Sequence, residues 1–302
     1  MTDNRLRIGS RTSPLALAQT EEVIVELRSL IPNWDFEVVP FVTDGDSRNS
    51  TPISNLGRGA FTTDIQNAVV NGEIDLAIHS AKDLPNTLPE GLSIFCISSR
   101  KDPRDVMINK WGVPLKEMPS GAVIGTGSPR RKAILKSLRN DITVVPIRGN
   151  VGTRIDKINR ENIDAVVLAA AGLVRLNRLE EVNEFFDTDI FVPDVGQGII
   201  AVQVRSEDIA TFSLLNEIQH QSTQIALIAE RAFLNALGGG CKVPVAAYAS
   251  IEGDAVNLIS VASDHEGSRL YKVQSTDSIS DPVEAGLNIA RKLLDSGAGA
   301  IL

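Results

Sequence analysis

The chain of 302 residues is poor in cysteine and histidine and lacks long apolar runs, and each of these features argues against a class of protein. Its two cysteines, Cys96 and Cys241, lie in unrelated surroundings, which argues against a disulfide framework and indicates a reducing compartment. The three histidines are scattered, without cysteine or carboxylate partners at metal-ligand spacing, so we expect no metal site. No apolar run approaches the length that spans a membrane, and the polar start of the chain predicts no signal peptide. A soluble, cytoplasmic protein is expected.

Basic residues are also fewer than acidic ones, and most of those present are arginine. The net charge of -8 disfavours a nucleic acid or an acidic membrane as partner. Of the 30 basic residues, 20 are arginine, and several follow short apolar runs. The arginine side chain is a rigid fork that matches carboxylate and phosphate groups. This pattern favours a small polyanionic ligand.

One cysteine lies in an unusual setting. Cys241 is part of the sequence GGGCKVP at 238–244, where three glycines remove the side chains that could shield the sulfur. Cys96, by contrast, lies within an apolar segment typical of a buried structural thiol. Two interpretations of the Cys241 loop stay open on these residues alone: a reactive or modified thiol, and a plain surface loop.

The hydrophobic pattern predicts two sets of alternating strands and helices. Short apolar runs separated by helical patterns imply two mainly parallel sheets, which bind ligands beyond the carboxyl ends of their strands. Those ends hold six charged residues: Arg11, Lys82, Asp83, Arg130, Arg131 and Arg148. The expected strands are 5–10, 36–42, 74–79, 93–97, 122–125, 142–147 and 165–168, and the expected helices are 14–30, 62–71, 129–139, 151–160 and 170–178.

A faint internal repeat links the two sets. The sequences IGSRTSP at 8–14 and IGTGSP at 124–129 both run from a strand through glycine to Ser-Pro and into a helix. Serine at the N-cap with proline at the first helical position starts a helix well. The repeat is explained either by two good helix caps or by two helix N-termini that bind an anion.

The breaks in the pattern predict three domains. The charged segment 98–104 and the segment 191–198 flank a block that we expect to be inserted into the first domain, with 199–204 returning to the first sheet. After about residue 220 a long helix, three closely spaced strands and a final helix predict a small α+β domain with an antiparallel sheet. The predicted domains are 1–99 with 197–217, then 103–193, and finally 220–302.

Seven motifs in order along the chain carry a resemblance to a known family. They are RTSPLALAQ at 11–19, HSAKDLP at 79–85, DPRD at 102–105, RGNVGTR at 148–154, AGL at 171–173, VGQG at 195–198 and GGCKVP at 239–244. Together they resemble the hydroxymethylbilane synthase family, also called the porphobilinogen deaminase family. The resemblance spans nearly the whole chain.

The resemblance implies a fold, a reaction and a cofactor. Two domains like those of periplasmic binding proteins are expected, followed by the small C-terminal domain that carries the cofactor cysteine. The family joins four porphobilinogen molecules head to tail, releases ammonia at each step and forms the linear tetrapyrrole hydroxymethylbilane. A dipyrromethane cofactor, held by a thioether to the residue that corresponds to Cys241, primes the reaction. A monomer with porphobilinogen as its small-molecule partner is expected.

The resemblance also implies roles for individual residues. Asp83 is the expected catalytic carboxylate, because a fixed carboxylate stabilises the cation left when ammonia departs and can pass protons to the amine. Its alternative is an aspartate that only caps a helix before Pro85. The expected cofactor-binding residues are Cys241, Lys82, Asp83, Ser128, Arg130, Arg131 and Arg148, and the expected substrate-binding residues are Arg11, Ser13, Gln19, Phe61, Arg148, Arg154 and Arg175.

Two rival functions are open at this level. A binding module for small anions would suit two domains with arginines at helix N-termini equally well, but it would not need a covalent anchor on Cys241. A hydrolase that pairs Cys241 with His79 would need a thiol that stays free. The segment 43–61, rich in glycine and small polar residues, is expected to cover the site.

Overall fold

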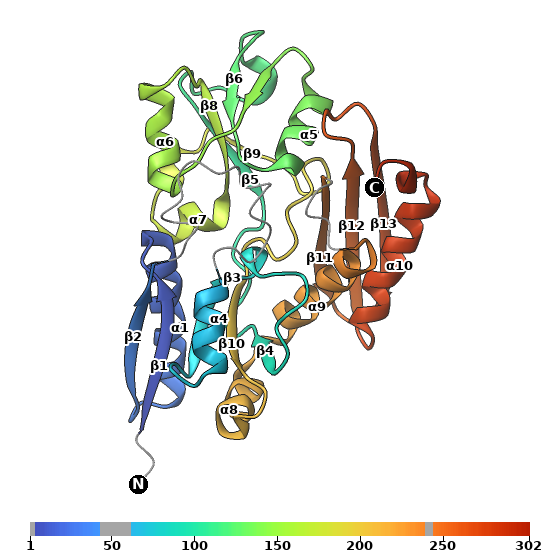
Figure 1. The fold of residues 1–302 in the computed structure, drawn as a ribbon. Helices are drawn as coiled ribbons and strands as arrows, with labels where there is room; N and C mark the ends of the chain where they lie inside the picture. Colours follow the sequence, from blue (N-terminus) through green and yellow to red (C-terminus); the bar gives the residue numbers. More distant parts are fainter. Residues whose placement is uncertain (1–3, 43–61, 239–243) are drawn as a thin grey trace. The chain divides into compact units, whose positions relative to one another are not determined.

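The computed structural model describes residues 4–42, 62–238 and 244–302, except for the side chain of Asn159. The chain forms two compact units, each described here by itself. Unit 1 comprises Met1–Arg100 with Ile199–Gln224, and unit 2 comprises Lys101–Gly198 with Ile225–Leu302. Figure 1 labels their helices and strands.

Unit 1 is built on a mixed five-stranded sheet in the order β2-β1-β3-β10-β4. β1 runs parallel to both β2 and β3, whereas β10 runs antiparallel to β3 and β4. The strands are β1 (Arg5–Arg11), β2 (Asp35–Phe41), β3 (Leu76–Ser80), β4 (Leu92–Phe95) and β10 (Ile200–Arg205), and the helices are α1 (Pro14–Leu30), α4 (Thr63–Val70), the short η1 (Ala81–Asp83) and α8 (Ile209–Ile218).

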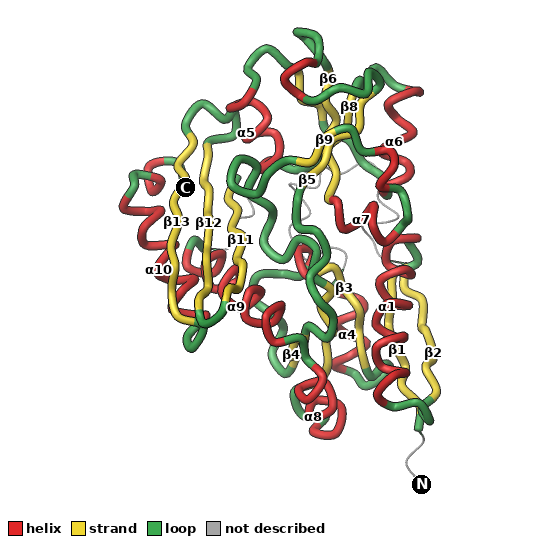
Figure 2. The backbone as a smooth tube through the Cα atoms, turned by 180° about the vertical axis from the view of Figure 1, so that it is seen from behind, coloured by secondary structure: helices red, strands yellow, loops and turns green. Residues whose placement is uncertain are grey.

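Helices cover both faces of this sheet, and the alternation of side chains along β3 explains how. Leu76 and Ile78 join a buried cluster with Val23 and Leu27 of α1, whereas Ala77 packs with residues of α4 on the other face. Both views show α1 and α4 on opposite sides of the strands (Figures 1 and 2). Because both faces are covered, four of the five residues of β3 are buried, and three of these are apolar.

Unit 2 contains a second five-stranded sheet, in the order β7-β6-β8-β5-β9. β6 is parallel to β7 and β8, and β5 is antiparallel to β8 and β9, so the arrangement repeats that of unit 1. Its strands are β5 (Asp105–Asn109), β6 (Val123–Gly125), β7 (Thr143–Val145), β8 (Ala165–Ala169) and β9 (Glu184–Phe185), and its helices are η2 (Leu115–Glu117), α5 (Pro129–Leu138), α6 (Val151–Arg160), α7 (Ala170–Arg175) and η3 (Leu179–Glu181).

The C-terminal part of unit 2 adds an antiparallel three-stranded sheet, β11-β12-β13. Helix α10 packs on its strands, and a core formed with α9 closes the layer. α5 contacts β12, and one buried cluster contains residues from both sheets of the unit. The elements are α9 (Gln221–Ala236), β11 (Val245–Glu252), β12 (Ala255–Ser263), β13 (Leu270–Ser278), α10 (Pro282–Asp295) and η4 (Ala298–Ala300), with α9 beginning in unit 1.

These elements confirm the predicted fold class of two mainly parallel sheets and a small antiparallel one. Four of the five strands in each large sheet run in the same direction, and α1 and α6 have the predicted bounds. The sequence analysis missed β5, β9 and α8. The finer division into three domains stays a prediction.

The internal repeat has a structural basis in both units. The Ser13 and Ser128 hydroxyls each accept a hydrogen bond from the backbone N–H three residues on, and a proline follows at the first helical position. The glycines before them are required by packing. A Cβ on Gly9 would lie 2.4 Å from the Ile74 side chain, and one on Gly125 would lie 2.8 Å from Ile147.

Within the described residues, no helix has both the length and the apolar character needed to cross a membrane.

A close helix contact in unit 2 generates a stability prediction. Alanine normally stabilises a helix relative to glycine, but a Cβ on Gly286 of α10 would lie 2.2 Å from the Ala229 carbonyl oxygen of α9. We expect Gly286→Ala to lower the free energy of unfolding by about 1–3 kcal/mol, measured by urea denaturation. Gly299→Ala is the matched control, because the nearest atom to its Cβ would be 3.8 Å away. Equal stability of the two variants would contradict this packing.

Candidate functional site

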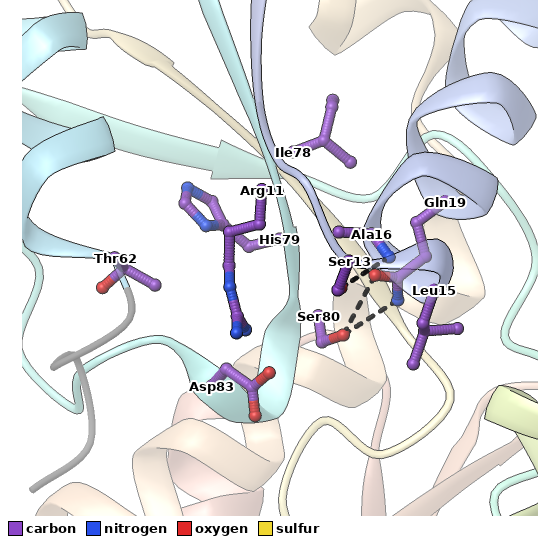
Figure 3. A pocket seen from close by; sticks show the side chains of 10 residues that line it. All are labelled: Arg11, Ser13, Leu15, Ala16, Gln19, Thr62, Ile78, His79, Ser80 and Asp83. Atoms are coloured by element: carbon purple, nitrogen blue, oxygen red, sulfur yellow. Dashed lines mark hydrogen bonds between the residues drawn. The ribbon is translucent and has the colours of Figure 1, made fainter. Parts of the chain in front are cut away.

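A pocket in unit 1 opens at the carboxyl ends of β1 and β3 (Figure 3). Its position follows the general rule that such sheets bind ligands beyond their strand ends. Arg11 is the last residue of β1, and Asp83 ends the short helical turn that follows β3. The lining residues are Arg11, Ser13, Leu15, Ala16, Gln19, Thr62, Ile78, His79, Ser80 and Asp83.

Local hydrogen bonds hold the α1 side of the pocket. The Ser13 hydroxyl caps α1 by accepting from the Ala16 N–H at 3.3 Å. One turn further, the Gln19 amide exchanges hydrogen bonds of 2.9 and 3.1 Å with the Ser80 hydroxyl at the end of β3. These two hydrogen bonds connect α1 to β3. They fix the distance between the pocket residues on the helix and those on the strand.

The charged residues of the pocket approach one another. Figure 3 shows the Arg11 side chain extending toward the carboxylate of Asp83. Asp83 is half-buried and ends a 3-10 turn whose N-cap residue, Ser80, makes no side-chain cap hydrogen bond. Lys82 precedes it in the same turn. Asp83 therefore lines the pocket together with Arg11.

His79 is the buried titratable residue of the pocket. Only 4% of its surface is exposed. Burial lowers the pKa of its imidazole, the side chain of Gln203 partly opposes this, and the positive charge of Arg11 lowers it further, to about 4. The imidazole is therefore neutral at pH 7.

Arg130 and Arg131, at the start of α5 in unit 2, are buried around one carboxylate. Asp105 is fully buried at the first position of β5, and its two oxygens lie 2.7 Å from Arg130 and 2.6 Å from Arg131. The Gln197 amide donates to the same carboxylate at 3.0 Å. Arg131 also donates to the Val167 carbonyl at 2.9 Å.

The charges of this cluster determine the protonation of Asp105. Burial by itself would raise the pKa of the carboxyl, but the attraction of Arg130 and Arg131 and the hydrogen bonds from Arg130 and Gln197 outweigh it. The pKa falls from 3.8 to about 2. Asp105 is thus ionised at neutral pH and balances part of the two buried positive charges.

Three further predicted arginines also lie in unit 2. Arg148 follows β7 and is half-buried, and Arg154 lies in the second turn of α6. The Arg154 Nε donates to the Gly149 carbonyl at 2.8 Å. Arg175 ends α7 and donates to the Gly198 carbonyl at 3.3 Å.

The structure brings four of the predicted site residues together: Arg11, Ser13, Gln19 and Asp83 all line the unit 1 pocket. Ser128, Arg130 and Arg131 share the start of α5 in unit 2. Cys241, Phe61 and the predicted cover at 43–61 lie outside the described residues. The predicted roles of all these residues at cofactor and substrate stay predictions.

Sequence reasoning missed two residues that the structure places centrally. His79 was considered only as a partner for Cys241 in a hydrolase, although it begins the HSAKDLP motif. Asp105 ends the DPRD motif, and an acidic residue that follows a charged segment gives no sign that it will be buried. Its pairing with Arg130 and Arg131 spans about 25 residues of sequence, so no local signal reveals it.

Removing the Asp105 charge should be strongly destabilising. Asp105→Asn would leave two buried guanidinium groups without their counter-ion, and we expect it to lower the free energy of unfolding by about 3–5 kcal/mol in urea denaturation at pH 7. Glu117→Gln is the control, because Glu117 is exposed and lies 3.9 Å from the exposed Lys116. A loss no larger than that of the control would refute the role of Asp105.

The lowered pKa of Asp105 predicts that the stability of the protein depends on pH in the acid range. Because its folded pKa of about 2 lies below the ordinary 3.8, its contribution is complete above pH 4 and is lost as the pH falls toward 2. The difference in unfolding free energy between the wild-type protein and Asp105→Asn should therefore shrink over this range. Urea denaturation at a series of pH values measures it, and a difference that stays constant down to pH 2 would contradict the assignment.

Comparison with known proteins identifies the family of the chain. Residues 6–213 match the family model "Porphobilinogen deaminase, dipyromethane cofactor binding domain", and residues 224–295 match "Porphobilinogen deaminase, C-terminal domain". Porphobilinogen deaminase of Alkaliphilus metalliredigens is 42% identical over 98% of this chain and 94% of its own. That of Bacillus subtilis is 42% identical over 97% and 94%, and that of Geobacter sulfurreducens is 41% identical over 100% and 95%.

Among solved structures, the methionine binding protein MetQ covers 72% of this chain and 89% of its own, at 11% identity and a TM-score of 0.44. That likeness is too low to add to the description of the fold. The sequence relatives and both family models agree along nearly the whole chain. The chain therefore belongs to the porphobilinogen deaminase family.

Proposed function

We propose that the unit 1 pocket is where this porphobilinogen deaminase releases ammonia from its substrate, with Asp83 as the catalytic carboxylate. The enzyme is a hydroxymethylbilane synthase, which condenses four porphobilinogen molecules into hydroxymethylbilane in tetrapyrrole biosynthesis. The observation that carries the proposal is the gathering of Asp83, Arg11, Ser13 and Gln19 around one pocket.

The chemistry of the substrate explains the need for a carboxylate. When ammonia leaves the aminomethyl group of porphobilinogen, positive charge develops on the substrate. A carboxylate fixed beside it stabilises charge that appears only as the bond breaks, which accelerates the reaction more than tight binding of the substrate would. Asp83 can also hold a proton on its way to the departing amine.

The acetate and propionate groups of the pyrroles explain the arginines. We assign Arg11, Ser13 and Gln19 to the incoming substrate, because all three line the pocket with Asp83. Arg148, Arg154 and Arg175 of unit 2 are assigned to carboxylates of the growing chain. Phe61 is assigned to substrate by resemblance alone.

A dipyrromethane cofactor belongs to the family domain that spans residues 6–213. The donors present here suit its carboxylates: Ser128 opens α5, Lys82 flanks Asp83, and Arg148 follows β7. Arg130 and Arg131 both form ion pairs with Asp105. If they also bind carboxylates of the cofactor, they must do so while they keep these ion pairs. When bound, the cofactor supplies the pyrrole on which the chain grows.

Cys241 is proposed as the attachment point of this cofactor. A thiolate is a strong nucleophile, and the C–S bond formed would be a permanent anchor, not a group regenerated in each turnover. The glycines at 238–240 leave room for a ring next to the sulfur. We further propose that the protein works in the cytoplasm as a monomer.

Asp83→Asn tests the catalytic assignment. The variant should fold normally but lose turnover by about 100-fold or more, the scale of one electrostatic contact in a transition state. Porphobilinogen consumption and ammonia release measure the turnover, and thermal denaturation measures folding. Glu73→Gln changes an exposed carboxylate of the same unit and should retain wild-type turnover. Near-normal turnover by Asp83→Asn would remove Asp83 from the mechanism.

Arg148→Leu tests the assignment of the unit 2 arginines. Loss of a guanidinium that holds a carboxylate should raise the substrate concentration needed for half-maximal rate, or halt elongation. Native gel electrophoresis of the enzyme with porphobilinogen would then show a changed set of intermediates. Arg160→Leu replaces an exposed arginine at the end of α6 and should leave the set unchanged. The assignment fails if both variants match the wild-type pattern.

A further inference from the structure

The loop 264–269, between β12 and β13, lies against helix α5 of the same unit (Figures 1 and 2). Gly267 is buried, whereas the loop residues on either side of it are exposed. A Cβ on Gly267 would lie 2.2 Å from the Ala133 carbonyl oxygen and 3.0 Å from the Ser137 nitrogen, which are both backbone atoms of α5. The backbone of the loop therefore packs directly on the backbone of the helix, with no room for a side chain between them.

Hydrogen bonds within the loop hold its shape. The Asp264 carboxylate accepts from the Ser268 N–H at 2.9 Å and from the Arg269 N–H at 3.0 Å. The Gly267 N–H donates to the Asp264 carbonyl at 3.2 Å. The hydroxyl and N–H of Ser268 and the N–H of Arg269 lower the pKa of the Asp264 carboxyl to about 2, so it is ionised at neutral pH. A loop closed in this way can fix the helix that it contacts.

Opposite charges also attract the loop to α5. The Lys132 ammonium lies 2.7 Å from the Glu266 carboxylate, and the charge of Lys136, one turn further along the helix, adds to the attraction. The side chain of Lys132 is 34% exposed and that of Glu266 is 66% exposed, so this ion pair is weak compared with the packing of Gly267. Its two charges can nevertheless be exchanged, which offers a test of the contact.

The contact joins two parts of unit 2 that the proposed function assigns to the cofactor. The start of α5 holds three of the expected cofactor-binding residues, beginning with Ser128. Ser263, the last residue of β12 before the loop, donates its N–H to the Pro244 carbonyl at 2.9 Å. Pro244 follows Cys241 by three residues in the sequence. The chain that continues from the proposed attachment point is therefore connected to α5 through this loop.

We propose that the loop 264–269 is a positioning element for the dipyrromethane cofactor, and that Gly267 is the residue through which it acts. By packing on the backbone of α5, Gly267 fixes the start of that helix relative to the chain that follows Cys241. A cofactor anchored at its sulfur reaches donors on α5 only when the two are held at the correct separation. A displacement of about 1 Å can cost a site about 100-fold in rate. The inference rests on the proposed function of Cys241 and α5.

Cofactor loading tests this role without depending on turnover. The full-length protein, produced free of cofactor, is incubated with porphobilinogen, and its intact mass shows how fast the two-pyrrole adduct forms. Gly267→Ala should load about 10-fold or more slowly than the wild-type protein, because the new Cβ displaces α5. Circular dichroism selects a temperature at which every variant is folded, so that a loss of stability alone does not change the rate.

Gly253→Ala is the matched control. Gly253 lies in the turn between β11 and β12 of the same sheet, and its φ of 56° is positive like the 72° of Gly267. No atom of the described residues would lie within 4 Å of its Cβ. The two variants therefore share the strain of an alanine at positive φ, and only Gly267→Ala loses the contact with α5. Gly253→Ala should load at the wild-type rate.

Exchange of the two charges gives a second test, which also decides the matter if Gly267→Ala does not fold. Lys132→Glu places two carboxylates together across the contact and should slow loading about 2- to 5-fold. Combining it with Glu266→Lys restores opposite charges but leaves the negative charge on α5. Recovery of the wild-type rate in the double variant would show that the loop contact, not the charge of the helix, determines loading.

The outcomes distinguish this inference from the proposed function. The inference is wrong if Gly267→Ala loads as fast as Gly253→Ala, or if the double variant loads no faster than Lys132→Glu, while the wild-type protein still gains its adduct. The proposed function then stands. If the wild-type protein gains no adduct on Cys241, the proposed function itself is wrong, and the inference fails with it.

Discussion

One buried carboxylate of unit 2 organises the start of α5, which carries three of the predicted binding residues. Asp105 binds Arg130 and Arg131 of α5, and Gln197 joins it from the segment that leads back to unit 1. Arg131 extends the cluster to β8 through the Val167 carbonyl. A buried ion pair costs desolvation, which is recovered only when the remaining donors and acceptors are satisfied, as most of them are here. The direction of α5, and with it the position of Ser128, depends on this cluster.

The unit 1 pocket is organised by a different use of charge. Arg11 and Asp83 line it at the strand ends, whereas burial lowers the pKa of His79 beside them and keeps its imidazole neutral. Such a site can attract a carboxylate through the arginine and stabilise a cation through the aspartate. Gln19 and Ser80 fix the two elements that carry these groups. A positive and a negative side chain therefore lie within one small pocket, as the proposed binding and catalytic roles require.

Sequence reasoning predicted local features well and long-range ones poorly. Apolar periodicity and the Ser-Pro caps located α1, α5 and α6, because both signals are written within a few residues. β5 was missed, because polar residues at both of its ends leave only three apolar residues in its pattern. Arg11, Ser13, Gln19 and Asp83, which the motifs of the family singled out, line one pocket, and the pattern of strands had already placed Arg11 and Asp83 at strand ends. The burial of Arg130 and Arg131 around Asp105 could not be predicted. The sequence of a helix does not show whether one of its arginines is exposed to solvent or paired with a buried carboxylate.

The central claim is that a dipyrromethane primer on Cys241 allows this enzyme to build a tetrapyrrole. The most direct measurement is the intact mass of the denatured protein after exposure to porphobilinogen, followed by mapping of the adduct to its peptide. The account predicts an added mass of two linked pyrrole units on the peptide that contains Cys241, absent from a Cys241→Ser variant. An unmodified Cys241 after incubation with porphobilinogen, or an adduct on another residue, would contradict it.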